Sequence, residues 1–249
     1  MIELIDIHKS FGNKVVLAGV SLRVQVGETL ALLGPSGTGK SVLLKHVIGL
    51  IEPDAGEVIV DGISIPDASD RQLARVRERV GYVFQGSALF DSMTVGENIC
   101  LGMDDGECRR NKAECEARMF ECLSLVNLAP DDAELYPAEL SGGMQKRVAI
   151  ARAIAGHQRY LLYDEPTTGL DPENAGIITN LMSDLRARLG VTGVIVTHDL
   201  DNAFRVADRV ALLYEGALHA EGTVEEFRAS SDPVVQQFIQ PSTESASVV

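Results

Sequence analysis

Apolar positions recur along the chain with two periods, and each period predicts a different kind of element. Short apolar runs bounded by turn residues predict strands over 2–7, 15–26, 29–33, 57–60, 63–65, 80–84, 160–163, 194–197 and 210–214. Spacings of three and four predict helices over 42–48, 69–78, 107–126, 144–155, 172–189, from residue 200, and over 232–240. Strands that alternate with helices are typical of an α/β fold built on a parallel sheet.

Polar residues mark several of the predicted helix starts. Ser69 with Gln72, and Thr94 with Glu97, have the spacing of a capping box, in which two side chains satisfy the first backbone N–H groups of a helix. Asp171 stands directly before a proline, which is a favourable N-cap and first-turn pair.

The middle of the chain differs from its two ends. Residues 107–126 are charged and helical in pattern and give no strand signal, which predicts a helical subdomain inserted into the α/β fold. A length of 249 residues suits one large domain with such an insertion. No run approaches the roughly 20 apolar residues of a membrane span, and the first residues lack signal-peptide order, so we expect a soluble, cytoplasmic protein.

The net charge of −14 is unevenly distributed. Residues 1–50 carry five Lys or Arg against three Asp or Glu, whereas residues 51–140 carry eight against nineteen. Proteins that bind nucleic acid present basic stripes, so this distribution argues against a nucleic-acid partner. The slightly basic first fifth suits a phosphate site.

Four cysteines lie close together in the sequence. Cys108, Cys115 and Cys122 repeat every seven residues and would share one face of a continuous helix, and Cys100 precedes them. At that spacing the sulfur atoms lie too far apart to form a disulfide, and metal sites favour tighter pairs. We therefore expect small apolar side chains on a half-buried helix.

Residues 34–41, between a predicted strand and a predicted helix, match the phosphate-binding loop of nucleoside triphosphate-binding proteins. Glycines let backbone N–H groups converge on phosphate oxygens, and the helix N-terminus faces the same anion. Lys40 would reach the β- and γ-phosphates, and Ser41 would ligate Mg²⁺. The residues expected to contact the nucleotide are Gly34, Pro35, Ser36, Gly37, Thr38, Gly39, Lys40 and Ser41. The alternative is a plain glycine turn, and the loop alone does not separate a transporter from a kinase, a GTPase or a DNA-directed machine.

Two carboxylates follow the predicted strand over 160–163. Asp164 would hold Mg²⁺ through water beside Ser41, and Glu165 would polarise the water that attacks the γ-phosphate. The alternative is an acidic turn after a strand.

A second phosphate-binding candidate opens the helix over 144–155. Ser141, Gly142 and Gly143 present a hydroxyl and backbone N–H groups at a helix start. One nucleotide does not need two such sites in one chain, but a head-to-tail dimer would place each nucleotide between the loop of one copy and this segment of the other. The alternative is an ordinary helix cap.

These motifs occur in a fixed order, which also includes Gln85 after a strand and His198 after another. The order resembles the nucleotide-binding subunit of ABC transporters, over residues 1–230. The resemblance implies an α/β fold: a P-loop NTPase, RecA-like core with an N-terminal antiparallel β subdomain and an inserted α-helical subdomain. We expect the core over 1–85 and 159–231, the helical subdomain over 86–158, and a C-terminal helix and tail over 232–249.

The resemblance also assigns roles and partners. Phe11 would stack on adenine, with a core aromatic as the alternative, and Gln85 would contact Mg²⁺ and the attacking water. Asp171 would reach across a dimer of two copies, and His198 would contact the γ-phosphate unless it is a histidine satisfied within the fold. ATP and Mg²⁺ are the implied cofactors, and an integral-membrane permease is the implied partner.

Three stretches bear on the subfamily. Met144 stands where the family motif usually has Gln, and with 86–95 and 232–239 it is similar to the Mla-type ATPases that power phospholipid transport with MCE-domain proteins. This implies phospholipid transport for outer-membrane lipid homeostasis, at the cytoplasmic face of a bacterial inner membrane, with residues 86–100 receiving the permease.

Two other functions stay open: the ATPase of an importer of amino acids or other small solutes, and a non-transport ABC protein acting on DNA or ribosomes. The latter usually has coiled coils or tandem domains, which this sequence lacks. The apolar stripe Val234, Val235, Phe238 and Ile239 would pack on a partner or on its own domain.

Overall fold

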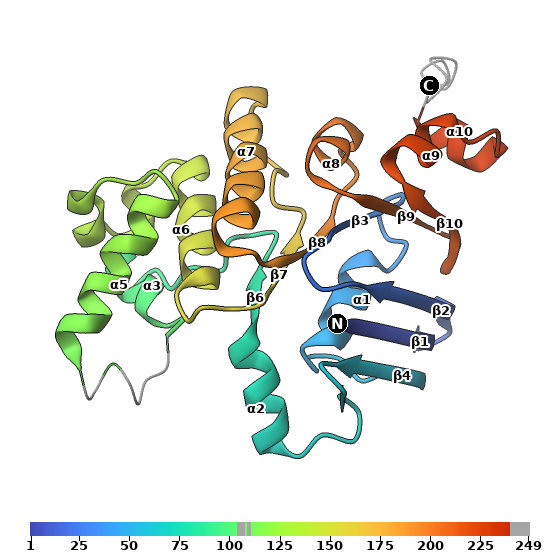
Figure 1. The fold of residues 1–249 in the computed structure, drawn as a ribbon, viewed down its shortest axis with the longest axis horizontal. Helices are drawn as coiled ribbons and strands as arrows, with labels where there is room; N and C mark the ends of the chain where they lie inside the picture. Colours follow the sequence, from blue (N-terminus) through green and yellow to red (C-terminus); the bar gives the residue numbers. More distant parts are fainter. Residues whose placement is uncertain (104–107, 109–110, 240–249) are drawn as a thin grey trace.

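Two β-sheets and the helices around them make up the computed structural model, which describes residues 1–103, 108 and 111–239 (Figure 1). The larger sheet has the order β10 (Ala217–Thr223), β9 (Arg209–Tyr214), β3 (Thr29–Leu33), β8 (Thr192–Val196), β7 (Tyr160–Asp164), β6 (Val80–Val83). Its strands are parallel except for β10, which runs antiparallel to β9. The smaller sheet is antiparallel, in the order β2 (Lys14–Val24), β1 (Ile2–Phe11), β4 (Ala55–Val60), β5 (Ile63–Ser64).

Helices cover both faces of the larger sheet. They are α1 (Lys40–Val47), α2 (Asp70–Arg79), α3 (Val95–Cys100), α5 (Lys112–Leu125), α6 (Gly142–Ile154), α7 (Pro172–Leu189), α8 (Leu200–Val206), α9 (Val224–Ala229) and α10 (Pro233–Ile239), with short 3₁₀ turns at Pro130–Glu134 and Pro137–Glu139. One core cluster joins the larger sheet to α3, α5, α6 and α7. A second joins the larger sheet to the smaller sheet, α1 and α2, and a third lies under α8, α9 and α10.

Alternation along the parallel strands explains this layering. On β7, Leu161 and Tyr163 belong to the cluster under α6 and α7, whereas Tyr160 and Leu162 face α1 and the smaller sheet. Every residue of β7 is buried, as expected for a strand covered on both faces. Polar residues for a site stand at the carboxyl ends of such strands, and the last residue of β7 is Asp164.

The α/β fold with an antiparallel β subdomain is confirmed, and so are both capping boxes. The helix predicted over 172–189 has those bounds, from the Asp171 N-cap to Gly190 in a left-handed conformation. The pattern missed β10 and α9. The division into 1–85, 86–158, 159–231 and 232–249 stays a prediction. No helix among the described residues is long and apolar enough to cross a membrane.

The expectation for the cysteines was wrong. The helix does not run continuously through 107–126, because α5 begins at Lys112 with Asn111 as its N-cap. Cys108 therefore lies outside that helix, and its Cα atom is 5.4 Å from that of Cys115, with a disulfide between the two. Cys122 is buried on α5, which is the small-apolar role expected of it.

The C-terminal stripe packs on its own domain. Val235 is fully buried against β3 and β9, and Val234, Phe238 and Ile239 pack on the same cluster. Of the two alternatives, packing on its own domain is the one that the structure shows, and a contact of the partly buried side chains with another protein stays a prediction. Residues 240–249, expected to be a disordered tail, lie outside the described residues.

Candidate nucleotide site

The phosphate loop connects β3 to α1 and depends on glycine at two positions. Gly39 caps α1 with a φ of 100°, a conformation that L side chains rarely adopt. A Cβ atom on Gly34 would lie 2.3 Å from the Leu213 carbonyl oxygen of the neighbouring strand β9. The loop can therefore pass this close to β9 only with glycine at position 34. Glycine at position 39 allows α1 to begin at Lys40.

Lys40 is the first residue of α1 and is almost fully buried. Its Nζ atom donates hydrogen bonds to the carbonyl oxygens of Gly34 (2.8 Å) and Pro35 (3.0 Å), so the side chain folds back into its own loop. Burial lowers the pKa of Lys40, against the opposing charges of Glu165 and Asp164. A poorly hydrated ammonium group inside a nest of N–H groups is suited to an anion.

Asp164 lies at the end of β7 and meets the phosphate loop through Ser41. The Ser41 hydroxyl donates to Asp164 Oδ1 at 2.5 Å, across 123 residues of sequence. No cluster of three or more His, Cys, Asp or Glu that could hold a metal occurs among the residues the structure describes. One hydroxyl and one carboxylate nevertheless fit Mg²⁺, which is usually bound by one or two side-chain oxygens together with substrate phosphates and water.

Glu165 and His198, two of the candidate site residues, lie in contact. His198 Nδ1 lies 2.9 Å from Glu165 Oε2, and the Thr168 hydroxyl donates to the same oxygen at 3.0 Å. Glu165 has a φ of 49°, and its backbone N–H donates to the Val196 carbonyl oxygen. The strained backbone turns the carboxylate out of line with β7, toward the mostly exposed His198.

Gln85 and Phe11 are the two remaining candidates of one copy, and each follows or ends a strand. Gln85 follows β6, and its carbonyl oxygen accepts a hydrogen bond from the buried Lys146 ammonium of α6. Phe11, at the end of β1, is 49% exposed, with Lys9 Nζ 5.5 Å from its ring centre. This exposure rules out the core-aromatic alternative for Phe11 and leaves its ring free to stack on a base.

Two predicted groups are not joined to the loop within one copy. The Ser141 hydroxyl accepts from the Met144 N–H at 3.3 Å and caps α6, which packs against α3, α5, α7 and β6. Asp171 caps α7 and accepts from the Asn174 N–H at 3.0 Å. Helix α1, by contrast, packs against β4 and β7 (Figure 1). Ser141, Gly142, Gly143 and Asp171 make no hydrogen bond to residues 34–41 in the described part of the chain.

Three further residues contact the site, and no sequence motif identifies them. Tyr82 donates to Asp164 Oδ2, Thr168 donates to Glu165, and Lys146 donates to the Gln85 carbonyl. A signal was available for Lys146, since a lysine inside an otherwise buried helix face needs a partner. Tyr82 sits in an apolar strand, where a tyrosine reads as a core residue.

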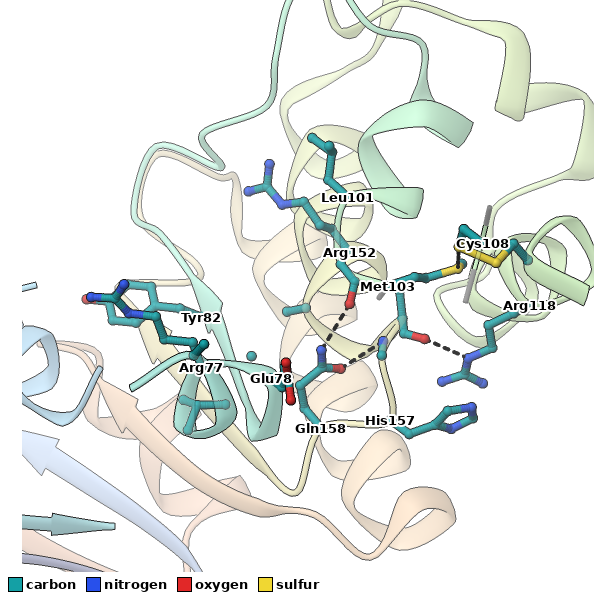
Figure 2. A pocket seen from close by; sticks show the side chains of 18 of the residues that line it. Arg77, Glu78, Tyr82, Leu101, Met103, Cys108, Arg118, Arg152, His157 and Gln158 are labelled. Atoms are coloured by element: carbon teal, nitrogen blue, oxygen red, sulfur yellow. Dashed lines mark hydrogen bonds between the residues drawn. A yellow bond between two sulfur atoms is a disulfide. The ribbon is translucent and has the colours of Figure 1, made fainter. Parts of the chain in front are cut away.

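A hollow of about 940 Å³ is lined by β6, α2, α5 and α6 (Figure 2). Arg77 and Glu78 of α2, Arg118 of α5 and Arg152 of α6 line it. The segment 86–100, expected to form a groove, does not line this hollow but lies beside it. Arg152 lines the hollow and also contacts this segment, because its guanidinium donates to the Ser87 and Ala88 carbonyl oxygens at 2.9 and 2.7 Å.

Several known proteins are similar to this chain in sequence and in fold. A family model described as ABC transporter matches residues 17–168. The methionine import ATP-binding protein of Brucella abortus (strain 2308) is 41% identical over 244 residues, and the probable ribonucleotide transport ATP-binding protein mkl of Mycobacterium bovis is 38% identical over 238. These matches cover 98% and 96% of this chain, which spans 65% and 66% of the relatives' own lengths.

A solved structure extends the likeness to three dimensions. It is a dimeric ATP-binding cassette in a post-hydrolysis state, bound to ADP and phosphate, and it is 34% identical with a TM-score of 0.77. The match covers 90% of this chain and 99% of that one. The chain therefore belongs to the ABC transporter family.

Proposed function

We propose that this protein is the ATP-hydrolysing subunit of a transporter. The observation that carries the proposal is one cluster: buried Lys40 inside the phosphate loop, the Ser41–Asp164 hydrogen bond, and Glu165 held by His198 and Thr168. Lys40 and the loop N–H groups bind the phosphates. Mg²⁺, when held by Ser41 and Asp164, supplies positive charge to the phosphate oxygens. Gln85, placed directly after β6, is proposed to contact the metal and the attacking water.

Glu165 is the general base of the proposed reaction. Its carboxylate accepts a proton from a water molecule as the water oxygen bonds to the γ-phosphorus and the bond to the β–γ bridging oxygen breaks, which releases ADP. His198 contacts the Glu165 carboxylate, and we propose that it contacts the γ-phosphate when nucleotide binds. Phe11 offers an exposed ring for the adenine.

Two copies are proposed to form the complete site. Ser141, Gly142 and Gly143 of one copy would bind the γ-phosphate held by the loop of the other, and Asp171 would contact the second copy. The dimeric form of the ADP-bound structural relative supports this arrangement. ATP then draws the copies together by contacts that the open state lacks.

Import of a small solute, such as an amino acid, is the transport that the relatives favour, because the methionine import protein matches nearly the whole chain. We place the protein at the cytoplasmic face of a bacterial inner membrane, bound to an integral-membrane permease. The hollow between α2, α5 and α6 is the proposed docking site for the permease, because Arg152 connects it to the segment that follows Gln85.

Phospholipid transport is the second candidate, since Met144 and the segments 86–95 and 232–239 are similar to Mla-type ATPases. In that case the complex would include an MCE-domain protein. The names of the relatives above do not point to lipid, so this candidate depends on those three stretches alone.

Purification of the intact membrane complex separates the two candidates. Mass spectrometry of the co-purified subunits and lipids would find a periplasmic solute-binding protein for the importer and an MCE-domain protein with phospholipid for the lipid transporter. Release of phosphate from ATP by the same preparation tests the shared proposal. A complex without ATPase activity in the presence of Mg²⁺ would overturn it.

A further inference from the structure

Tyr82 makes a buried contact with the acidic end of β7. Its hydroxyl donates to Asp164 Oδ2 at 3.0 Å, while the Ser41 hydroxyl donates to Oδ1 at 2.5 Å. The two bonds reach the carboxylate from different sides: Tyr82 belongs to β6, the neighbouring strand, and Ser41 belongs to α1. Each oxygen of Asp164 therefore has its own partner.

The two partners differ in what nucleotide binding requires of them. Ser41 is the proposed ligand of Mg²⁺, so its hydroxyl must give up the Asp164 contact or share it when the metal binds. Tyr82 lies on β6, the last strand of the larger sheet, and its ring packs on Phe84 with 4.3 Å between the ring centres, so nothing in the proposed reaction displaces it.

We infer that Tyr82 is a positioning residue for the metal site: its hydroxyl holds Asp164 Oδ2 so that Oδ1 faces Ser41 and the metal. This inference rests on the proposed function. Without the hydroxyl, the Asp164 carboxylate can rotate about its Cβ–Cγ bond, and its Oδ2 atom loses a hydrogen-bond donor. Groups that orient metal ligands in this way typically change metal affinity or activity by 10- to 100-fold.

The test compares Tyr82→Phe with a matched control, Tyr163→Phe. Tyr163 is a buried tyrosine on the adjacent strand β7, faces the opposite side of the sheet, and makes no hydroxyl hydrogen bond within the described residues. Both substitutions remove one oxygen and keep the ring. Calorimetry would measure the affinity for a non-hydrolysable ATP analogue in Mg²⁺ and in EDTA, and the ATPase rate would be followed against Mg²⁺ concentration.

For Tyr82→Phe we expect about a 10-fold weaker affinity in Mg²⁺, an unchanged affinity in EDTA, and half-maximal ATPase at a higher Mg²⁺ concentration. Tyr163→Phe should match the wild type in all three. Equal losses in Mg²⁺ and in EDTA, or no change at all, would overturn the positioning role. If the wild type itself binds the analogue equally with and without Mg²⁺, the proposed metal site fails, whatever Tyr82 does.

Discussion

At the scale of single residues, the site contains the buried positive charge of Lys40, which the phosphates of a nucleotide would neutralise. The hydrogen bonds of Lys40 go to two main-chain carbonyl oxygens of its own loop, which carry only partial charge. Burial lowers the pKa of this ammonium group, so the protein pays for holding it there. Phosphate oxygens would offer it full negative charge in the same place.

Replacement of Lys40 by alanine should therefore weaken ATP binding without unfolding the protein. Loss of a charged hydrogen bond to phosphate corresponds to roughly 1.5–3 kcal/mol, or about a 10- to 100-fold rise in the dissociation constant. Calorimetry with ATP is the measurement. Lys45→Ala is the control, because Lys45 lies on the same helix but in its last turn. An unchanged ATP affinity in Lys40→Ala would remove Lys40 from the phosphate site.

Which residues the sequence reveals follows from where their partners lie. Loop residues such as Lys40 and Ser41 are contiguous, so a sequence motif identifies them. Glu165 can be identified because it directly follows an apolar strand. Tyr82 has its partner 82 positions away. That pairing depends on β6 lying beside β7, and strand order is not written in the local pattern.

At the scale of elements, Asp61 joins the smaller sheet to the rest of the fold. It lies between β4 and β5, and its Oδ2 atom is 3.3 Å from Arg79 Nη1 of α2 and 3.2 Å from Arg159 Nη1 before β7. The Tyr160 hydroxyl donates to Oδ1. Burial acts to raise the pKa of Asp61, but this hydrogen bond and the nearby positive charges outweigh burial, so the pKa lies below its usual 3.8.

Asp61→Asn should therefore destabilise the protein in a pH-dependent way. A carboxyl group whose pKa is lower in the folded state stabilises it above about pH 4, and this contribution is lost as the pH falls through the folded-state value. We expect a loss of about 1–3 kcal/mol at pH 7 that shrinks below pH 4, measured by urea unfolding. Asp67→Asn, at an exposed position nearby, is the control. A pH-independent difference would contradict this role of the charge.

The same scale explains where the pattern failed. The helix over 172–189 was predictable because Asp171 and Gly190 mark its ends. Strand β10 lies at the sheet edge, none of its residues is fully buried, and its apolar run is therefore too weak to notice. The cysteine spacing implied one helix, but Asn111 caps a new helix between Cys108 and Cys115.

The Cys108–Cys115 cross-link should stabilise the start of α5. A disulfide that closes a loop of this length contributes roughly 2–3 kcal/mol by restricting the unfolded chain. We expect a reductant to lower the melting temperature of the oxidised wild type and to leave Cys115→Ser unaffected. Cys100→Ser should behave as the wild type, because Cys100 is a free cysteine. Mass spectrometry after alkylation would identify the bond, and alkylation of all four cysteines before reduction would contradict it.

At the scale of the whole molecule, the residues of the proposed site belong to two separate parts of the chain's fold. The loop, Asp164 and Glu165 gather at the carboxyl ends of strands β3 and β7, whereas Ser141 begins α6, which packs against α3, α5 and α7. Figure 1 shows these helices as a group. Within the described residues of one copy, the Ser141 hydroxyl caps its own helix. A second copy, turned head to tail, would bring that helix start to the nucleotide and give both parts a common ligand.

Glu165→Gln should expose this assembly. The amide keeps the shape of the side chain but cannot accept the water proton, so we expect ATP binding with hydrolysis at least about 100-fold slower, and dimers that persist. Light scattering after gel filtration, with and without ATP, measures the dimer. Glu165→Gln combined with Ser141→Arg should bind ATP yet stay monomeric, because the added side chain fills the contact with the γ-phosphate. Wild-type turnover by Glu165→Gln would remove Glu165 from the chemistry, and monomers of that variant in saturating ATP would refute the shared site.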